Sequence, residues 1–121
     1  MADLKTILID NGLDYQGIMN RFMHNDKLYL NILFMLPSDD NLQKLKSAIE
    51  VQDYETAFNA AHTLKGVAGN LGLVYLEQTI SSIVEPLRRG ELCYDYLTLC
   101  QSVEMELTRV FILIEQLKEV M

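Results

Sequence analysis

The stretch AHTLKGVAGNLG, residues Ala61–Gly72, places one histidine, one lysine and several glycines inside a strongly helical segment. Glycine costs roughly 1 kcal/mol relative to alanine in a helix interior, so Gly66 and Gly69 indicate that something approaches the backbone near His62. A helix advances about 100° per residue, which puts Lys65, Gly66 and Gly69 within about 60° of His62 on one stripe.

The apolar residues of this segment form a different stripe, centred roughly 130° away from His62. Its members are Tyr54, Ala57, Ala61, Leu64, Ala68 and Leu71. We therefore expect His62 to lie beside the buried face and to be partly exposed. Asn59, at about 60° on the same helical wheel, shares the histidine face and is a candidate contact for a partner. Together these residues predict a docking site built around a histidine.

The rest of the chain is also predicted to be helical. Short helices are expected at Leu4–Ile9 and Leu13–Met23, then at Lys27–Leu36 and from Ser38 or Asp39 to about Val51, with the last two able to form one helix kinked at Pro37. Asp53 is expected to cap the histidine helix, which ends at Gly72. Val74–Arg89 follows, stops at Gly90 and contains Pro86 near its end, where a kink is expected.

The longest helix is expected last, at about Cys93–Val120. Its apolar residues step by three or four, as the seam of a bundle requires: Tyr96, Leu99, Val103, Leu107, Val110, Ile114, Leu117 and Met121. Short connections between long helices favour antiparallel neighbours. We predict an all-α, antiparallel up-and-down four-helix bundle with short additional N-terminal helices. It forms one domain over residues 1–121, with its core at about 27–120, and its ends suggest a stand-alone module.

Composition excludes several classes of function. The formal net charge of −7 argues against nucleic acid and anionic membranes as partners, and is more simply a device for solubility. No apolar run reaches the roughly 18 residues of a transmembrane helix, and no secretory signal opens the chain, so a cytoplasmic protein is expected. Cys93 and Cys100 lie roughly 10 Å apart along a helix, too far for a disulfide, and no residues show metal-ligand spacing.

The stretches His62–Gly66 (HTLKG) and Asn70–Gly72 (NLG) resemble the signature of histidine-containing phosphotransfer (HPt) domains. Length and helical layout fit this family too, so the resemblance covers nearly the whole chain. Val67 stands where many members carry serine or alanine, a departure that leaves the chemistry untouched.

The resemblance implies a phosphohistidine carrier of a two-component phosphorelay. His62 would accept a phosphoryl group from a receiver-domain aspartate or a kinase and pass it to another receiver, and Lys65 would neutralise the phosphate oxygens. Gly66 and Gly69 would leave room for the receiver. The chain would be no enzyme and have no cofactor of its own, since Mg²⁺ is expected on the receiver. Its partners would be response-regulator receiver domains and a hybrid histidine kinase, and we expect a monomer.

Other interpretations remain open from the residues. The bundle could be a non-catalytic binding module for receiver domains, or an enzyme using His62 as a general base or metal ligand, although an enzyme needs a concave pocket. Gly69 could instead allow close helix packing. Arg88 and Arg89 could border the docking surface or simply complement a helix end. The methionines Met19, Met23 and Met35 are interpreted as core filler.

Overall fold

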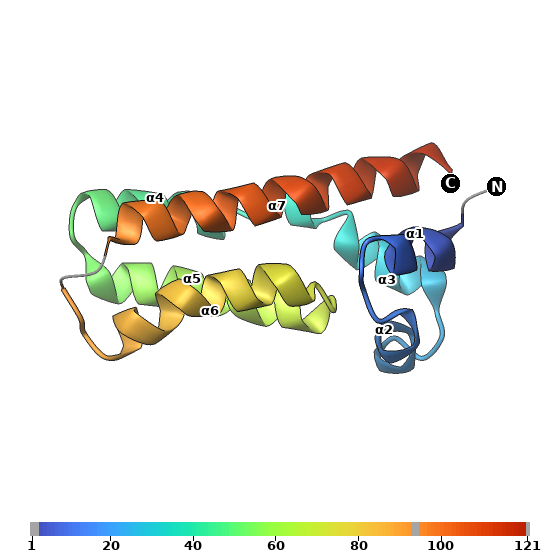
Figure 1. Cartoon of the computed structure of the whole chain (residues 1–121), viewed down its shortest axis with the longest axis horizontal. Coiled ribbons are helices and arrows are strands. Elements are labelled where there is room, and N and C mark those ends of the chain that lie inside the picture. Colours follow the sequence, from blue (N-terminus) through green and yellow to red (C-terminus); the bar gives the residue numbers. More distant parts are fainter. Residues whose placement is uncertain (1–2, 93–94, 121) are drawn as a thin grey trace.

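The computed structural model describes residues 3–92 and 95–120, and every regular element in these ranges is a helix (Figure 1). The elements are α1 (Leu4–Asp10), α2 (Tyr15–Arg21), α3 (Asp26–Leu33), a 3₁₀ turn (Leu36–Ser38), α4 (Asn41–Glu50), α5 (Tyr54–Asn70), α6 (Val74–Arg88) and α7 (Tyr96–Glu119). The predicted all-α class is confirmed.

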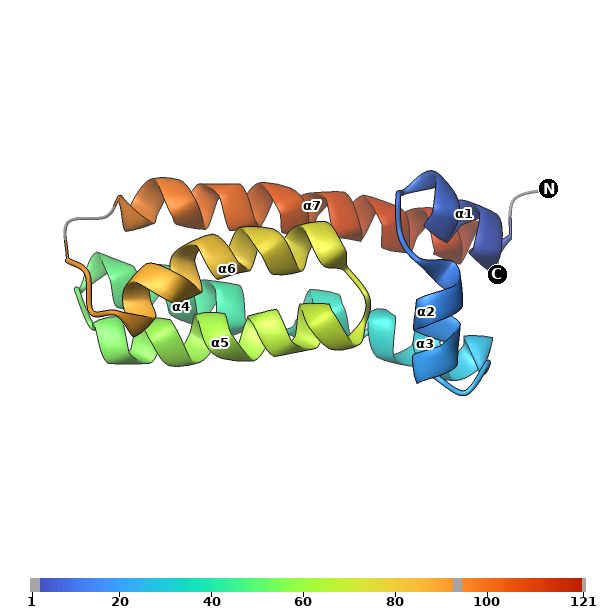
Figure 2. The ribbon, with the colours of Figure 1, turned by 60° about the horizontal axis from the view of Figure 1, so that its bottom comes forward.

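The four longest helices form the predicted antiparallel, up-and-down bundle. Each of α4 to α7 packs against the next, and α4 closes the bundle against α7 (Figure 2). The short helices α1, α2 and α3 gather at one end, beside the C-terminal part of α7 (Figure 1). The short N-terminal helices were predicted, and they cap one end of the bundle.

The segments on either side of Pro37 do not form one kinked helix. α3 ends at Leu33, and a 3₁₀ turn with Pro37 in its first positions separates it from α4, which begins at Asn41. Proline has no N–H and disfavours helical geometry in the residue before it, so the helix stops instead of bending. As a result α3 belongs to the end cap rather than to the four long helices.

Aspartate caps fix where the histidine helix α5 and the last helix α7 begin. The carboxylates of Asp53 and Asp95 accept hydrogen bonds from the backbone N–H of the threonine three residues later, at 3.2 and 3.1 Å, and from its hydroxyl at 2.6 Å. These hydrogen bonds, the hydroxyl's first, hold the pKa of both carboxyls below the usual value. The Asp53 cap is as predicted, whereas α7 begins at Tyr96; the expected start at Cys93 lies outside the described residues.

Glycines in the left-handed region end α5 and α6. Gly72 (φ 69°) follows α5, and the N–H of Leu73 donates to the carbonyl of Ala68 at 2.9 Å. Gly90 (φ 70°) follows α6 in the same way. This geometry satisfies carbonyls that a helix end leaves unpaired, and glycine adopts it without a Cβ clash. Both stop signals were predicted, within two residues of the observed helix ends.

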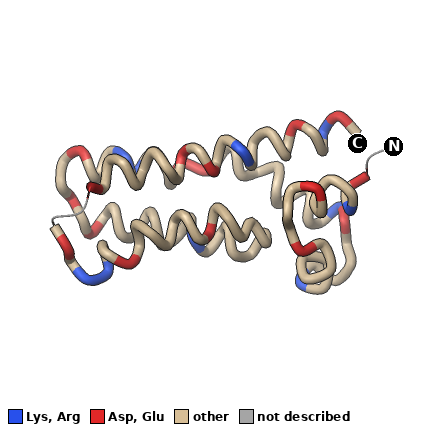
Figure 3. Tube along the Cα trace, in the orientation of Figure 1, with Lys and Arg blue, Asp and Glu red and all other residues tan. Residues whose placement is uncertain are grey.

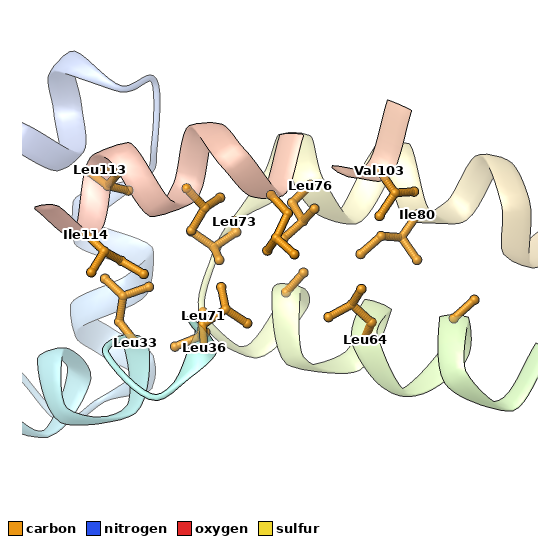
Figure 4. Close-up of a cluster of buried hydrophobic side chains, with 14 of the residues drawn as sticks. Leu33, Leu36, Leu64, Leu71, Leu73, Leu76, Ile80, Val103, Leu113 and Ile114 are labelled. Carbon is orange, nitrogen blue, oxygen red and sulfur yellow. The ribbon is translucent and has the colours of Figure 1, made fainter. Parts of the chain in front are cut away.

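The core runs along the bundle and into the cap (Figure 4). Every described member of the predicted α7 seam is buried except Leu99, which is half-buried. The apolar stripe of α5 is buried as well, apart from half-buried Tyr54. These two faces are the reason that α5 holds a fixed rotation about its axis, with the histidine stripe turned away from the core.

Tyr29 ties the cap to the histidine helix. Its ring is fully buried, its hydroxyl donates to the carbonyl of Leu71 at 2.8 Å, and burial raises the pKa of the phenol. Leu33 and Leu36 lie beside Leu71 and Ile114 in the same cluster (Figure 4). The cap is therefore packed onto the end of α5 through both apolar and polar contacts.

Two of the three methionines interpreted as core filler are on the surface. Met19 is buried, but Met23 is 76% exposed and Met35 68% exposed. Each lies two residues after the last residue of a short helix, in a connection between helices. Cys100 is a buried free thiol, and burial raises its pKa to about 11. Within residues 3–92 and 95–120, no helix is both long and apolar enough to span a membrane.

Candidate functional site

His62 projects from the side of α5, eight residues after the helix begins at Tyr54. Its side chain is exposed, whereas Ala61 and Leu64 on either side of it are buried. The sequence prediction of an exposed histidine beside the buried face is therefore confirmed. A rigid, well-packed helix presents the imidazole to the solvent.

The imidazole is stacked on the ring of Phe58, one helical turn earlier. The two ring centroids are 5.5 Å apart and the rings are within 14° of parallel. On the α6 side, the guanidinium of Arg88 lies 5.2 Å from the centroid of the same Phe58 ring. Phe58 was not singled out from the sequence, although its spacing of four residues from His62 is the spacing at which helical side chains meet.

Lys65 lies one turn after His62, at the edge between α5 and α6. Its ammonium is 4.0 Å from a carboxylate oxygen of Glu85 on α6, and the other oxygen of Glu85 is 3.7 Å from Arg88. Helical spacing puts the Cβ atoms of Lys65 and His62 about 5–6 Å apart. The site therefore holds two cations, Lys65 one turn from His62 and Arg88 on the Phe58 ring, joined by a carboxylate that sequence reasoning did not identify.

Gly66 and Gly69 have different surroundings. A Cβ added at Gly66 would meet nothing within 4 Å, so the backbone there is open to an approaching molecule. A Cβ at Gly69 would come within 3.0 Å of a carboxylate oxygen of Glu77, and the Gly69 carbonyl accepts a hydrogen bond from the Arg21 guanidinium of α2. The bare patch next to His62 is therefore centred on Gly66, and the surroundings of Gly69 favour the close-packing interpretation.

The remaining candidates divide between the site and its border. Asn59 is exposed on the histidine stripe. Arg88 joins the site through Phe58 and Glu85, whereas Arg89 forms an ion pair with Glu91 beyond the end of α6. Figure 3 shows this end of α6 as a pair of basic residues flanked by acidic ones. In the part of the chain that the structure describes, no three His, Cys, Asp or Glu residues form a group that could hold a metal ion.

An exposed imidazole, a neighbouring ammonium and bare backbone can serve as a nucleophile for a group delivered from outside. The profile of the Hpt domain family matches residues 32–111, about two thirds of the chain, including the whole of α5 and α6. The chain belongs to the Hpt domain family. As an Hpt domain it is a phosphotransfer carrier of phosphorelay signalling.

A solved structure supports the same assignment. The crystal structure of histidine-containing phosphotransfer protein B (HptB) from Pseudomonas aeruginosa PAO1 is 29% identical and superposes with a TM-score of 0.77. The match covers 90% of this chain and 96% of the HptB chain, so the similarity extends over most of the chain and beyond the four long helices. No match was found among curated proteins.

Proposed function

We propose that His62 is the phosphoacceptor of this Hpt domain. The observation that carries the proposal is the exposed His62 ring on α5, with the Lys65 ammonium and the open backbone of Gly66 on the same stripe. An imidazole nitrogen attacks the phosphorus of a receiver's aspartyl phosphate and forms a P–N bond. The P–O bond breaks, and its electron pair leaves with the aspartate carboxylate. The reverse reaction delivers the group to a second receiver.

Each neighbouring residue has a proposed part in this transfer. Lys65 offsets the charge of the phosphate oxygens, since phosphoryl transfer depends on positioning and charge stabilisation. Phe58 holds the imidazole in one orientation by stacking, which limits the rotamer freedom lost on reaction. Gly66 lets the receiver's loops come close to His62, and Asn59 lies where it can contact the receiver. The arrangement needs no kinase or phosphatase centre in this chain.

The proposed partners are receiver domains of response regulators, and a hybrid histidine kinase as the source of the phosphoryl group. The Mg²⁺ ion of the transfer is assigned to the receiver and no cofactor to this chain. We propose that the chain acts as a monomer in the cytoplasm, where its receivers would be. A single exposed histidine stripe supports one receiver at a time.

The test is transfer from a phosphorylated receiver. Receiver domains from the same organism would be labelled on aspartate with radioactive acetyl phosphate, freed of donor, and mixed with this chain. We expect label to move to the chain within minutes from at least one receiver and to return to that receiver when fresh unlabelled domain is added. A receiver that binds without losing its label would instead identify a non-catalytic binding module.

A further inference from the structure

Glu85 is a negatively charged residue in a site that is proposed to bind a negatively charged phosphoryl group. It lies on α6 with its carboxylate between two cations, 4.0 Å from the Lys65 ammonium and 3.7 Å from the Arg88 guanidinium. Its side chain is 46% exposed and that of Lys65 is 29% exposed, so the pair is only partly screened by solvent. Lys65, the cation assigned to the phosphoryl group, is thus already engaged when His62 is unmodified.

The Lys65 ammonium is a point charge on a flexible four-carbon stem, so it can turn from Glu85 towards His62. A phosphoryl group on His62 carries up to two negative charges and competes with the carboxylate for the same ammonium. Arg88 does not need to move in this exchange. It is held against the Phe58 ring and remains beside Glu85, so the carboxylate keeps one cation after Lys65 leaves.

We infer that Glu85 is a built-in competitor of the phosphoryl group for Lys65, and that it keeps the phosphohistidine from being held too tightly. This inference rests on the proposed function of His62. Transfer of the phosphoryl group onto His62 breaks the Lys65–Glu85 ion pair, and transfer of the group away from His62 restores it. Glu85 thereby raises the phosphoryl-transfer potential of the carrier and favours passing the group on over storing it.

The experiment compares phosphorylation by a small donor, which removes the receiver from the comparison. Potassium phosphoramidate would be added to the parent protein and to Glu85→Gln, and ³¹P NMR would follow the phosphohistidine signal. In this reaction the P–N bond of the donor breaks, ammonia leaves and the P–N bond to His62 forms. We expect Glu85→Gln to react about two- to fivefold faster at low salt, the range set by the loss of one exposed ion pair. The increase should shrink at 1 M salt.

The matched control is Glu104→Gln. Glu104 pairs with Lys46 at 3.1 Å, is 49% exposed, and joins α4 to α7 rather than α5 to α6. The Glu104→Gln substitution removes the same charge from a similar interhelical ion pair on another edge of the bundle. It should leave the rate of phosphorylation by phosphoramidate unchanged. Melting curves of both variants would verify that each is folded.

The Lys65→Met variant distinguishes competition for the Lys65 ammonium from direct repulsion between the Glu85 carboxylate and the phosphoryl group. If Glu85 acts by occupying Lys65, Glu85→Gln should lose most of its effect in the Lys65→Met background, and Glu85→Asp should react more like the parent. An equal acceleration with and without Lys65, or none at all, would overturn the inference while leaving His62 as acceptor. Failure of the parent protein to form phosphohistidine at His62 would overturn the proposed function and the inference together.

Discussion

Substitutions at Gly66 should affect stability and function in opposite directions, because the structure shows no packing reason for a glycine there. It lies inside α5, its φ is not positive, and a Cβ would meet nothing within 4 Å. Gly66→Ala should therefore stabilise the domain by roughly 0.5–1 kcal/mol, which raises the melting temperature by about 2–5 °C. Gly66→Gln should stabilise it almost as much, since glutamine is also a good helix former.

The functional effect of Gly66→Gln should have the opposite sign. A side chain on the bare patch would hold a docked receiver away from His62, and a displacement of about 1 Å can slow a transfer on the order of 100-fold. We expect transfer from a phosphorylated receiver to slow by about tenfold or more, with the rate from phosphoramidate unchanged. Gly69→Ala is the matched control: its Cβ would press on the flexible end of Glu77, so it should bring little gain in stability. If Gly66→Gln took up the phosphoryl group from a receiver at the rate of the parent protein, the docking role of the bare backbone would be refuted.

Three further predictions concern the charge of Lys65, the packing of the N-terminal end cap, and the pH dependence of stability. Lys65→Ala should slow phosphoryl transfer while binding of an unphosphorylated receiver, measured by calorimetry, stays the same; a loss of binding would show that Lys65 serves docking instead. Tyr29→Phe should lower the free energy of unfolding by about 1–3 kcal/mol in urea titrations, because it leaves the Leu71 carbonyl buried without its donor; an unchanged midpoint would contradict that hydrogen bond. The lowered pKa values of Asp53 and Asp95 mean that their caps stabilise the fold above the ordinary value of 3.8, and that this contribution disappears as pH falls through the lower folded values. Asparagine at both positions caps without titrating, so melting temperatures of that double variant should fall less steeply below pH 3.8 than those of the parent.

Local signals in the sequence were sufficient for most helix boundaries. Asp53 and Gly72 bracket the histidine helix because a side-chain cap and a left-handed glycine act within a few residues. The spacing Asp95-x-x-Thr98 repeats that of Asp53-x-x-Thr56, so the start of α7 could have been placed by the same rule. The break at Pro37 was visible too, but the position of α3 in the end cap depends on packing against segments distant in the sequence.

Predicting the contacts around His62 from the sequence would have required the register between α5 and α6. Glu85 is twenty residues from Lys65, and their pairing depends on how α5 slides and rotates against α6, which side-chain packing in the core decides. The same register places Arg88 over Phe58. Sequence periodicity gives the face of each helix but not the height at which two faces meet, so it found the histidine stripe of α5 and missed its neighbours on α6.

The most direct test of the account is phosphorylation of His62→Gln beside the parent protein. With a phosphorylated receiver as donor, the parent should take up label that is lost in acid and survives alkali, as expected of a phosphoramidate bond. The variant should take up none, although its melting temperature should be nearly unchanged because an exposed residue contributes little packing. Label on His62→Gln, or acid-stable label on the parent, would contradict His62 as the phosphoacceptor.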